Sequence, residues 1–469
     1  MLELNNVILV LEGSILIYVI ALHISYFALN VSSFVCASQS VASRVLDLLP
    51  RRYAESDLPV SILIPAYNEE TTINATIQSL LQIEYTEFEL VVINDGSRDR
   101  TIEVLKKDFA LVPAVESFET QLPTKPIRCL YTSSLYPSLR VIDKENGGKA
   151  DALNAGINYS RKPIFCAIDA DSILGRDSLH RAVQPFLDNP NTIACSGTVR
   201  GVNGCKVRRG FLIETGLPRN ALALFQVVEY IRAFLFGRLG WLPLNSILVI
   251  PGAFGVFRKR NVVAAGGYRT DTVGEDIDLV LRLHRDHRLQ DKNYSISFVP
   301  DAICWTELPE RMKTLKVQRI RWQRGLSESL RNNQQLVCHP KGGSVGWLAM
   351  PFFVLFEWLS AFLETGGYIL VLVGLFLGFV QPHFAAIFFI LAIGLGALNS
   401  ASAIFLDELA FHRYPKFQHV LVLFLFAVFE NVGYRQLNAL WRTVALIQWV
   451  RGRPARWGAM ARNTTWQIR

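Results

Sequence analysis

The chain has 469 residues, of which 51% are apolar and 19% are charged, and its formal net charge is +8. This length is sufficient for two or three domains, and the concentration of apolar residues at 7–35 and after Val345 excludes a uniformly soluble protein. Residues 435–469 contain seven arginines and no acidic residue, directly after an apolar run, so we expect this tail to contact anionic lipid headgroups and not nucleic acid.

The first apolar segment, residues 7–35, is long enough to span a bilayer, which takes about 20 apolar residues. Because no Lys or Arg precedes Arg44, the basic start of a signal peptide is missing, and we predict a transmembrane helix within residues 1–43. Arg44, Arg51 and Arg52 follow this segment, which by the positive-inside tendency places the next domain in the cytoplasm.

The middle of the chain, residues 44–341, alternates short β-branched runs with helical stretches. We expect strands at residues 60–65, 89–94 and 164–168, and helices at residues 71–82 and 99–109. Strands that alternate with helices predict an α/β domain with a mixed, mostly parallel, Rossmann-like sheet. The ligands of such a sheet gather at the carboxyl ends of its strands.

Residues 219–250 mix apolar runs with charged side chains. Two interpretations stay open for them. They form either an amphipathic helix lying in the membrane interface or an ordinary core helix.

The C-terminal region, residues 342–469, is the second membrane region. We expect spans at about residues 347–378, 384–406 and 418–434. A further short stretch at 436–450 is interrupted by Arg442, so the number of crossings, and the side of the membrane on which the basic interfacial tail lies, stay open.

Polar residues follow each predicted strand at the point where it ends. The candidates are Pro65 at the end of the first strand with Tyr67, Asn68 and Glu69 after it, Asp95 after the second, and Asp169 and Asp171 after the third. Two carboxylates two residues apart can both reach one hard divalent cation, so the last pair is a candidate site for Mg²⁺ or Mn²⁺. The alternative for such loop acids is turn formation and helix capping.

A glycine-rich run, Asn-Gly-Gly-Lys at residues 146–149, lies between the second and third strands. The glycines free backbone amides and Lys149 supplies a positive charge, so a phosphate could be held here. The spacing is not that of a P-loop, and the alternative is a glycine-mediated helix start.

Three acidic residues, Glu275, Asp276 and Asp278, follow Gly274 at the predicted start of a helix. The helix dipole favours acids at this position, which is a structural reason for some of them. Beside a phosphate and a metal, one of them could also serve as a general base.

Gln318, Arg321 and Trp322 share one helical face just before the second membrane region. A guanidinium binds phosphate oxygens well, and an indole offers an apolar face to a sugar ring. The alternative is an amphipathic helix whose Arg and Trp anchor it at the lipid interface.

In this order, with apolar segments on both sides, these motifs resemble those of the processive, membrane-embedded family 2 glycosyltransferases, which include cellulose, chitin, hyaluronan and poly-N-acetylglucosamine synthases. The resemblance covers about residues 59–330 by motif and the flanking spans by architecture. The runs at 251–257, 275–276 and 305–307 look most like the poly-N-acetylglucosamine synthase type. The resemblance implies a cytoplasmic GT-A domain inserted between transmembrane helices.

The resemblance also implies a role for each motif. Asp276 would be the catalytic base, and Asp169 and Asp171 would bind the metal. The nucleotide sugar would be bound by Pro65, Tyr67, Asn68, Glu69, Asp95, Lys149, Asp169 and Arg321, and the acceptor by Gln318, Trp322 and Glu275. The chain departs from the pattern at Ser172 after the paired aspartates, at Gly274 where a threonine is often found, and in having one evident N-terminal span where several relatives have two.

We therefore expect a metal-dependent, inverting glycosyltransferase of the cell membrane that moves a sugar from UDP-N-acetylglucosamine or UDP-glucose to a growing β-linked exopolysaccharide. One alternative is a non-processive transferase that adds a single sugar to a lipid acceptor. Another is an inactive scaffold that keeps the fold, which the intact acidic motifs argue against. The donor sugar, the linkage and any polysaccharide export partners stay open.

Overall fold

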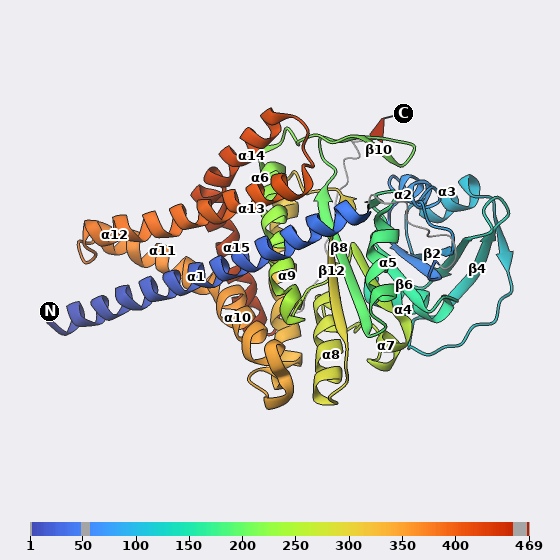
Figure 1. The fold of residues 1–469 in the computed structure, drawn as a ribbon. Helices are drawn as coiled ribbons and strands as arrows, with labels where there is room; N and C mark the ends of the chain where they lie inside the picture. The colour runs from blue at the N-terminus through green and yellow to red at the C-terminus, as the bar shows by residue number, and fades with distance from the viewer. Residues whose placement is uncertain (1, 48–56, 454–466, 469) are drawn as a thin grey trace.

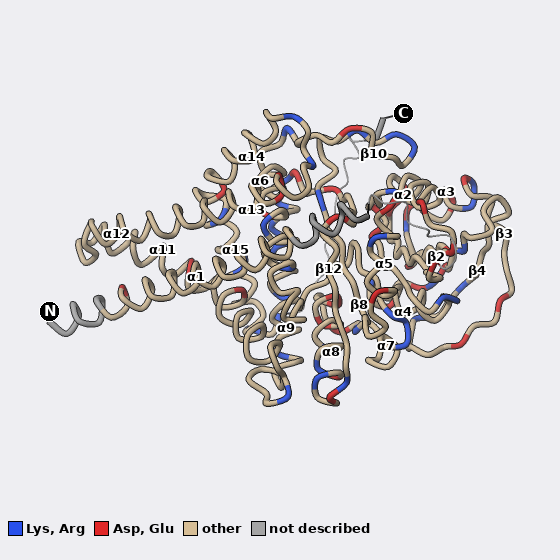
Figure 2. The backbone as a smooth tube through the Cα atoms, in the orientation of Figure 1, with Lys and Arg blue, Asp and Glu red and all other residues tan. Residues whose placement is uncertain are grey.

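The computed structural model describes residues 2–47, 57–453 and 467–468, with side chains for residues 10–38 and 57–453. A long N-terminal helix and a group of C-terminal helices project from one side of an α/β domain (Figure 1). Charged residues gather in the α/β domain and beside it, whereas the projecting helices carry few of them (Figure 2).

The α/β domain is built on a ten-stranded sheet in the order β3-β4-β5-β2-β1-β6-β11-β8-β12-β7. Its strands are β1 (Val60–Ala66), β2 (Phe88–Asp95), β3 (Leu111–Ala114), β4 (Ile127–Ser133), β5 (Leu139–Lys144), β6 (Ile164–Ile168), β7 (Ile173–Leu174), β8 (Thr192–Gly201), β11 (Phe254–Arg258) and β12 (Ser295–Thr306). Among these described strands, β4, β7 and β11 run opposite to the rest, so the sheet is mixed and mostly parallel, as predicted.

The central strands are largely apolar and buried, as is typical of a sheet with helices on both faces. β1 is buried at every position except the half-buried Pro65. Helix α4 packs on β1 and β2, and α5 packs on β8 and β12. The predicted strand at 164–168 coincides with β6, and the carboxyl ends of β1, β2 and β6 therefore lie at one edge of the sheet.

The helices of this domain are α2 (Ile73–Leu80), α3 (Thr101–Asp108), α4 (Lys149–Tyr159), α5 (Ser178–Asp188), α6 (Ala221–Leu235), α7 (Lys259–Ala264), α8 (Glu275–Leu289) and α9 (Met312–Asn332). A second, small sheet has the order β10-β9-β13, with β9 at Lys206–Arg208, β10 at Phe211–Glu214 and β13 at Gln467–Ile468.

The segment at 219–250 is not one helix. The side chain of Asn220 caps α6, which ends at Leu235, and a short 3-10 helix, η1, follows at Leu239–Leu244. Gly237, Gly240 and Pro243 explain the break, because glycine and proline disfavour continued α-helix. α6 contacts both the sheet strand β8 and the apolar helices α13 and α14, so it combines features of the two interpretations.

Four described helices are long and apolar enough to cross a membrane: Val10–Ser38, Val345–Phe376, Pro382–Phe411 and Phe417–Val450. The first lies within α1 (Leu2–Asp47). The others are built from η4 (Val345–Ala349), α10 (Met350–Phe352), η5 (Phe353–Trp358) and α11 (Ser360–Phe376); from α12 (Pro382–Phe389), η6 (Ile390–Leu395) and α13 (Gly396–Phe411); and from α14 (Phe417–Phe429), η7 (Glu430–Tyr434) and α15 (Arg435–Val450).

The stretches expected separately at 418–434 and 436–450 form one helical run with a local break at Val432 and Gly433. Arg435 and Arg442 do not interrupt it, because both are satisfied inside the protein: Arg435 pairs with Glu364 at 3.1 Å, and the Nε of Arg442 donates to Gln323 at 2.8 Å. α15 thereby packs along α9 and α11.

Candidate active site

The glycine-rich loop is folded onto the carboxylate of Asp95 at the end of β2. The backbone N–H groups of Gly147 and Gly148 donate to its two oxygens at 3.0 and 2.7 Å. Gly148 has a φ of 89°, a conformation that glycine adopts without strain, and Lys149 is the first residue of α4. Asp95 therefore fixes the position from which Lys149 extends.

The two glycine amides are thus already used, which corrects the expectation that they are free to hold a phosphate. The cause lies in the pairing of β2 with β5, which sets Lys144 opposite Asp95. The Lys144 side chain is wholly buried, and its Nζ lies 2.7 Å from Asp95 and 2.5 Å from Asp151. The buried Lys144 cation, paired with both carboxylates, therefore stabilises the position of the glycine-rich loop.

Lys149 and Asp276 meet on either side of a single backbone residue, Gly252. Lys149 forms an ion pair with Asp169 and donates to the carbonyl oxygen of Gly252 at 3.3 Å. The N–H of Gly252 donates to Asp276 Oδ2 at 3.2 Å. The predicted phosphate ligand and the predicted base, 127 positions apart in the chain, are therefore one glycine apart in space.

The electrostatics of the site also join residues from separate elements. Burial lowers the pKa of Lys149, but the carboxylates of Asp169, Glu275 and Asp276 outweigh it, so the net shift is upward. Burial, together with the charge of Asp276, raises the pKa of Glu275 to about 7, against the opposing effect of Lys149 and Arg321. These charges from α4, the end of β6, α8 and α9 act on one another within a single region.

The predicted acceptor face lies on α9 next to α6. The indole of Trp322 is 39% exposed, its ring lies 6.4 Å from that of Tyr230, and the guanidinium of Arg319 lies 4.4 Å from its centroid. Burial, with a further contribution from Asp171, raises the pKa of Tyr230 to about 12. Tyr230 therefore lies beside Trp322, on the α6 side of this face.

Gln318 lies one turn earlier on α9 and is buried, with 8% of its surface exposed. Its carbonyl oxygen has no hydrogen-bond partner within the described part of the chain. A buried amide oxygen without a partner costs free energy, so this atom is an unsatisfied acceptor one turn from Trp322.

The loop after β1 contacts the loop after β2. Asn68, which has a φ of 57°, donates its backbone N–H to Ser97 Oγ at 3.0 Å, and Glu69 donates its own to Thr101 Oγ1 at 2.9 Å. Tyr67 is 44% exposed between these elements. Pro65 and this loop therefore lie beside the carboxyl end of β2, where nucleotide binding was predicted.

The paired aspartates provide two carboxylates directly after β6. Asp171 is buried and Asp169 is half-buried against Lys149. No group of three or more His, Cys, Asp or Glu residues that could hold a metal occurs in the described ranges. Two carboxylates nevertheless fit a Mg²⁺-like ion, which usually takes one or two protein ligands and completes its shell with phosphate oxygens and water.

Comparison with known families identifies the family of the chain. The sequence matches the model described as glycosyl transferase family 2 over residues 61–259, and the model described as glycosyl transferase family group 2 over residues 164–399, about half of the chain. The chain belongs to glycosyl transferase family 2. The α/β sheet and the four apolar helices confirm the fold class expected for this family.

The curated relatives of this glycosyltransferase include poly-β-1,6-N-acetyl-D-glucosamine synthases. It is 29% identical over 272 residues to that of Staphylococcus epidermidis and 29% identical over 278 residues to that of Staphylococcus aureus. Each match covers 58% of this chain and 55% of the relative, so the chain spans about half the length of the curated relatives it matches. Among solved structures, a mannosyltransferase from Pyrobaculum calidifontis in complex with GDP-Man and Mn²⁺ has a TM-score of 0.48 and 16% identity, covering 92% of this chain and 100% of its own.

The sequence motifs assigned no role to three residues of the candidate site: Lys144, Tyr230 and Gly252. Lys144 ends the strand β5, which also contains Arg140 and Asp143, so its composition does not show that Lys144 is buried. Nothing local marks Tyr230, and Gly252 lies in the run 251–257, which supported the family resemblance but gave this residue no role. Their roles arise from contacts with residues distant in the sequence, namely Trp322 and Asp276.

Proposed function

We propose that this family 2 glycosyltransferase is an inverting enzyme that transfers a sugar from a UDP-sugar, UDP-N-acetylglucosamine or UDP-glucose, to a growing β-linked polysaccharide at the cytoplasmic face of the membrane. In this proposal residues 44–341 are the catalytic domain, and residues 1–43 and 342–469 are its membrane regions. The observation that carries it is the hydrogen-bonded sequence Lys149–Gly252–Asp276, which sets a cation for the leaving group beside a carboxylate for the nucleophile.

Sugar transfer requires that the leaving diphosphate be neutralised while the acceptor hydroxyl loses its proton. Lys149 and Arg321 supply positive charge to the diphosphate. A Mg²⁺ or Mn²⁺ ion held by Asp169 and Asp171 would neutralise further charge on the same group when bound.

Asp276 accepts the proton of the acceptor hydroxyl as that oxygen attacks the anomeric carbon. A single displacement inverts this centre, so an α-linked donor gives a β-linked product. No second nucleophilic carboxylate is needed, in contrast to a retaining hydrolase.

The acceptor sugar stacks on Trp322, whose exposed face suits a pyranose ring. Gln318, with its unpartnered buried oxygen, accepts a hydroxyl hydrogen from the same acceptor, and Glu275 contacts it from the start of α8. Asp95 and the residues Pro65, Tyr67, Asn68 and Glu69 hold the nucleoside on the opposite side of Lys149.

The test is UDP release by the full chain in lipid nanodiscs from a panel of nucleotide sugars, followed by analysis of product size and linkage. We expect turnover of UDP-N-acetylglucosamine or UDP-glucose, a polymeric β-linked product, and loss of turnover in Asp276→Asn. Full activity of Asp276→Asn would remove it from the base role. A product limited to one sugar on lipid would replace the polymer in the proposal with a lipid acceptor.

A further inference from the structure

Two glycines bring the helix that carries Asp276 into backbone contact with the helix that carries Trp322. Gly274 directly precedes α8, and Gly325 lies on α9, three residues after Trp322. A Cβ atom added to Gly274 would lie 2.6 Å from the Cα of Gly325, and one added to Gly325 would lie 2.7 Å from the Cα of Gly274. Gly274 has a φ of −117°, so glycine is needed here for space and not for conformation.

Polar contacts hold the same junction on both sides of the glycines. Glu328 on α9 accepts from Thr272 Oγ1 at 2.8 Å and from the N–H of Val273 at 3.0 Å. Ser329 Oγ donates to the carbonyl oxygen of Gly274 at 3.2 Å. The turn that precedes Asp276 is therefore held against α9 by side-chain hydrogen bonds as well as by close packing.

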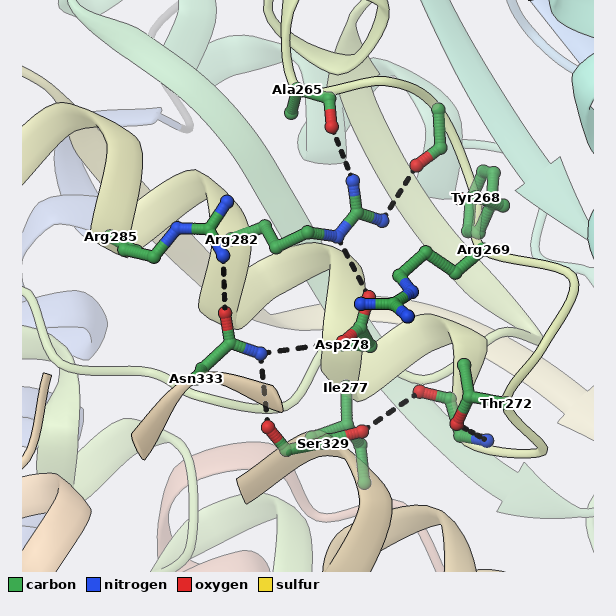
Figure 3. Close-up of polar contacts among 12 residues, drawn as sticks. Ala265, Tyr268, Arg269, Thr272, Ile277, Asp278, Arg282, Arg285, Ser329 and Asn333 are labelled. Atoms are coloured by element: carbon green, nitrogen blue, oxygen red, sulfur yellow. Dashed lines mark hydrogen bonds and ion pairs between the residues drawn. The ribbon is translucent and has the colours of Figure 1, made fainter. Parts of the chain in front are cut away.

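Asp278 on α8 and Asn333 at the end of α9 add further polar contacts between the two helices (Figure 3). Asn333, just after α9, donates to Asp278 at 3.3 Å and accepts from Arg285 at 3.2 Å, and Arg282 donates to Asp278 at 2.7 Å. The carboxylate of Asp278 is wholly buried in these contacts. The third acid of the 275–278 motif is thus structural, which leaves Asp276 as the acid that faces Gly252.

We infer that Gly274 and Gly325 are positioning residues whose contact fixes the spacing between the base Asp276 and the acceptor platform at Trp322. This inference rests on the proposed function. It also accounts for Gly274 at a position where the resembling family often has threonine, because Gly325 occupies the space that a side chain would need.

A methyl group at either glycine would drive the two backbones apart. Ordinary contact begins at 3.4 Å, so the 2.6 Å approach would have to open by about 0.8 Å. A displacement of about 1 Å between reacting groups can cost about a hundredfold in rate. The nucleotide-side contacts of Asp95 are carried by β2 and α4 and do not involve this junction, so donor binding should be spared.

The experiment compares Gly274→Ala and Gly325→Ala with Gly216→Ala in the full chain in nanodiscs. Gly216 is a matched control, because its added Cβ would also meet glycine backbone, 2.2 Å from the carbonyl oxygen of Gly204, away from α8 and α9. We expect turnover of the UDP-sugar to fall about a hundredfold in the two junction variants. UDP affinity should stay within about twofold, and more of the remaining turnover should be hydrolysis to free sugar.

Glu328→Gln serves as a milder probe that keeps the packing and weakens only the polar tether, so it should give a smaller decrease of the same kind. If the alanine variants do not fold, Glu328→Gln and Ser329→Ala test the inference instead. Both should lower turnover while UDP affinity stays unchanged. Turnover equal to that of the Gly216 variant, or loss of UDP affinity in step with turnover, would overturn the inference. A wild-type chain that turns over no donor overturns the proposed function instead, and this inference with it.

Discussion

Gly252→Ala is the most direct probe of the contact between the leaving-group cation and the base. The added Cβ would lie 2.7 Å from Lys149 Nζ and 3.7 Å from Asp276 Oδ2, so the collision falls on the lysine. The backbone is held: Arg238 donates to the Val249 carbonyl oxygen at 3.2 Å, three residues before Gly252. Lys149, the flexible partner, must therefore move.

Moving Nζ to ordinary contact at 3.4 Å means a shift of about 0.7 Å from its position between Asp169 and Gly252. A hydrogen bond to a charged group contributes about 1.5–3 kcal/mol. If the hydrogen bond from Lys149 to the diphosphate is lost, kcat/KM for the UDP-sugar should decrease by about tenfold to a hundredfold, since about 1.4 kcal/mol corresponds to a factor of ten. Because only the end of a flexible side chain is displaced, we expect little change in Tm.

The assay is steady-state UDP release with the donor varied, alongside thermal unfolding of the same samples. Gly374→Ala is the control, since its added methyl would lie 2.4 Å from Val380 Cγ2 in the apolar helices. A kcat/KM within twofold of the wild type in Gly252→Ala, with Tm unchanged, would show that the position of Lys149 beside Gly252 is irrelevant to turnover.

Two further predictions concern buried charges. Lys144→Ala leaves the carboxylates of Asp95 and Asp151 unpaired in the interior, so the free energy of unfolding should fall by about 3–5 kcal/mol; a Tm equal to that of the exposed-site variant Lys107→Ala would contradict this. Glu275 has a folded pKa of about 7 against an ordinary 4.5, so its protonated form stabilises the fold and that contribution is lost as pH rises from about 4.5 through about 7. The Tm of the wild type relative to Glu275→Gln should therefore decrease over this range, and parallel curves would refute the shift.

The parts of the fold that depend on local pattern were predictable from the sequence. A short apolar run predicted β6, because a strand that is buried on both faces is usually rich in apolar residues. The start of α4 was suggested by the glycines that precede it. The start of α8 was suggested by Gly274 and the acidic residues of its first turn. The apolar helices could be predicted from the length and hydropathy of their segments.

The parts that depend on strand register or distant packing were not predictable. The amides of Gly147 and Gly148 looked free because nothing local shows that β5 will set Lys144 opposite Asp95 and draw the loop onto that carboxylate. The same holds for α15, where Arg435 lay between two stretches that were expected separately and Arg442 suggested an interruption. Their partners, Glu364 and Gln323, lie 71 and 119 residues away.

The positive charge at the centre of the site persists across the neutral pH range, because three carboxylates raise the pKa of Lys149. This charge is paired with Asp169. A diphosphate that engages Lys149 must therefore compete with that carboxylate, and the binding free energy of the donor is reduced by the ion pair it breaks. Removing the competitor while keeping the shape, as in Asp169→Asn, should consequently strengthen the binding of free UDP measured without metal, even as it weakens turnover; UDP affinity that falls under these conditions would show that Asp169 does not restrain Lys149.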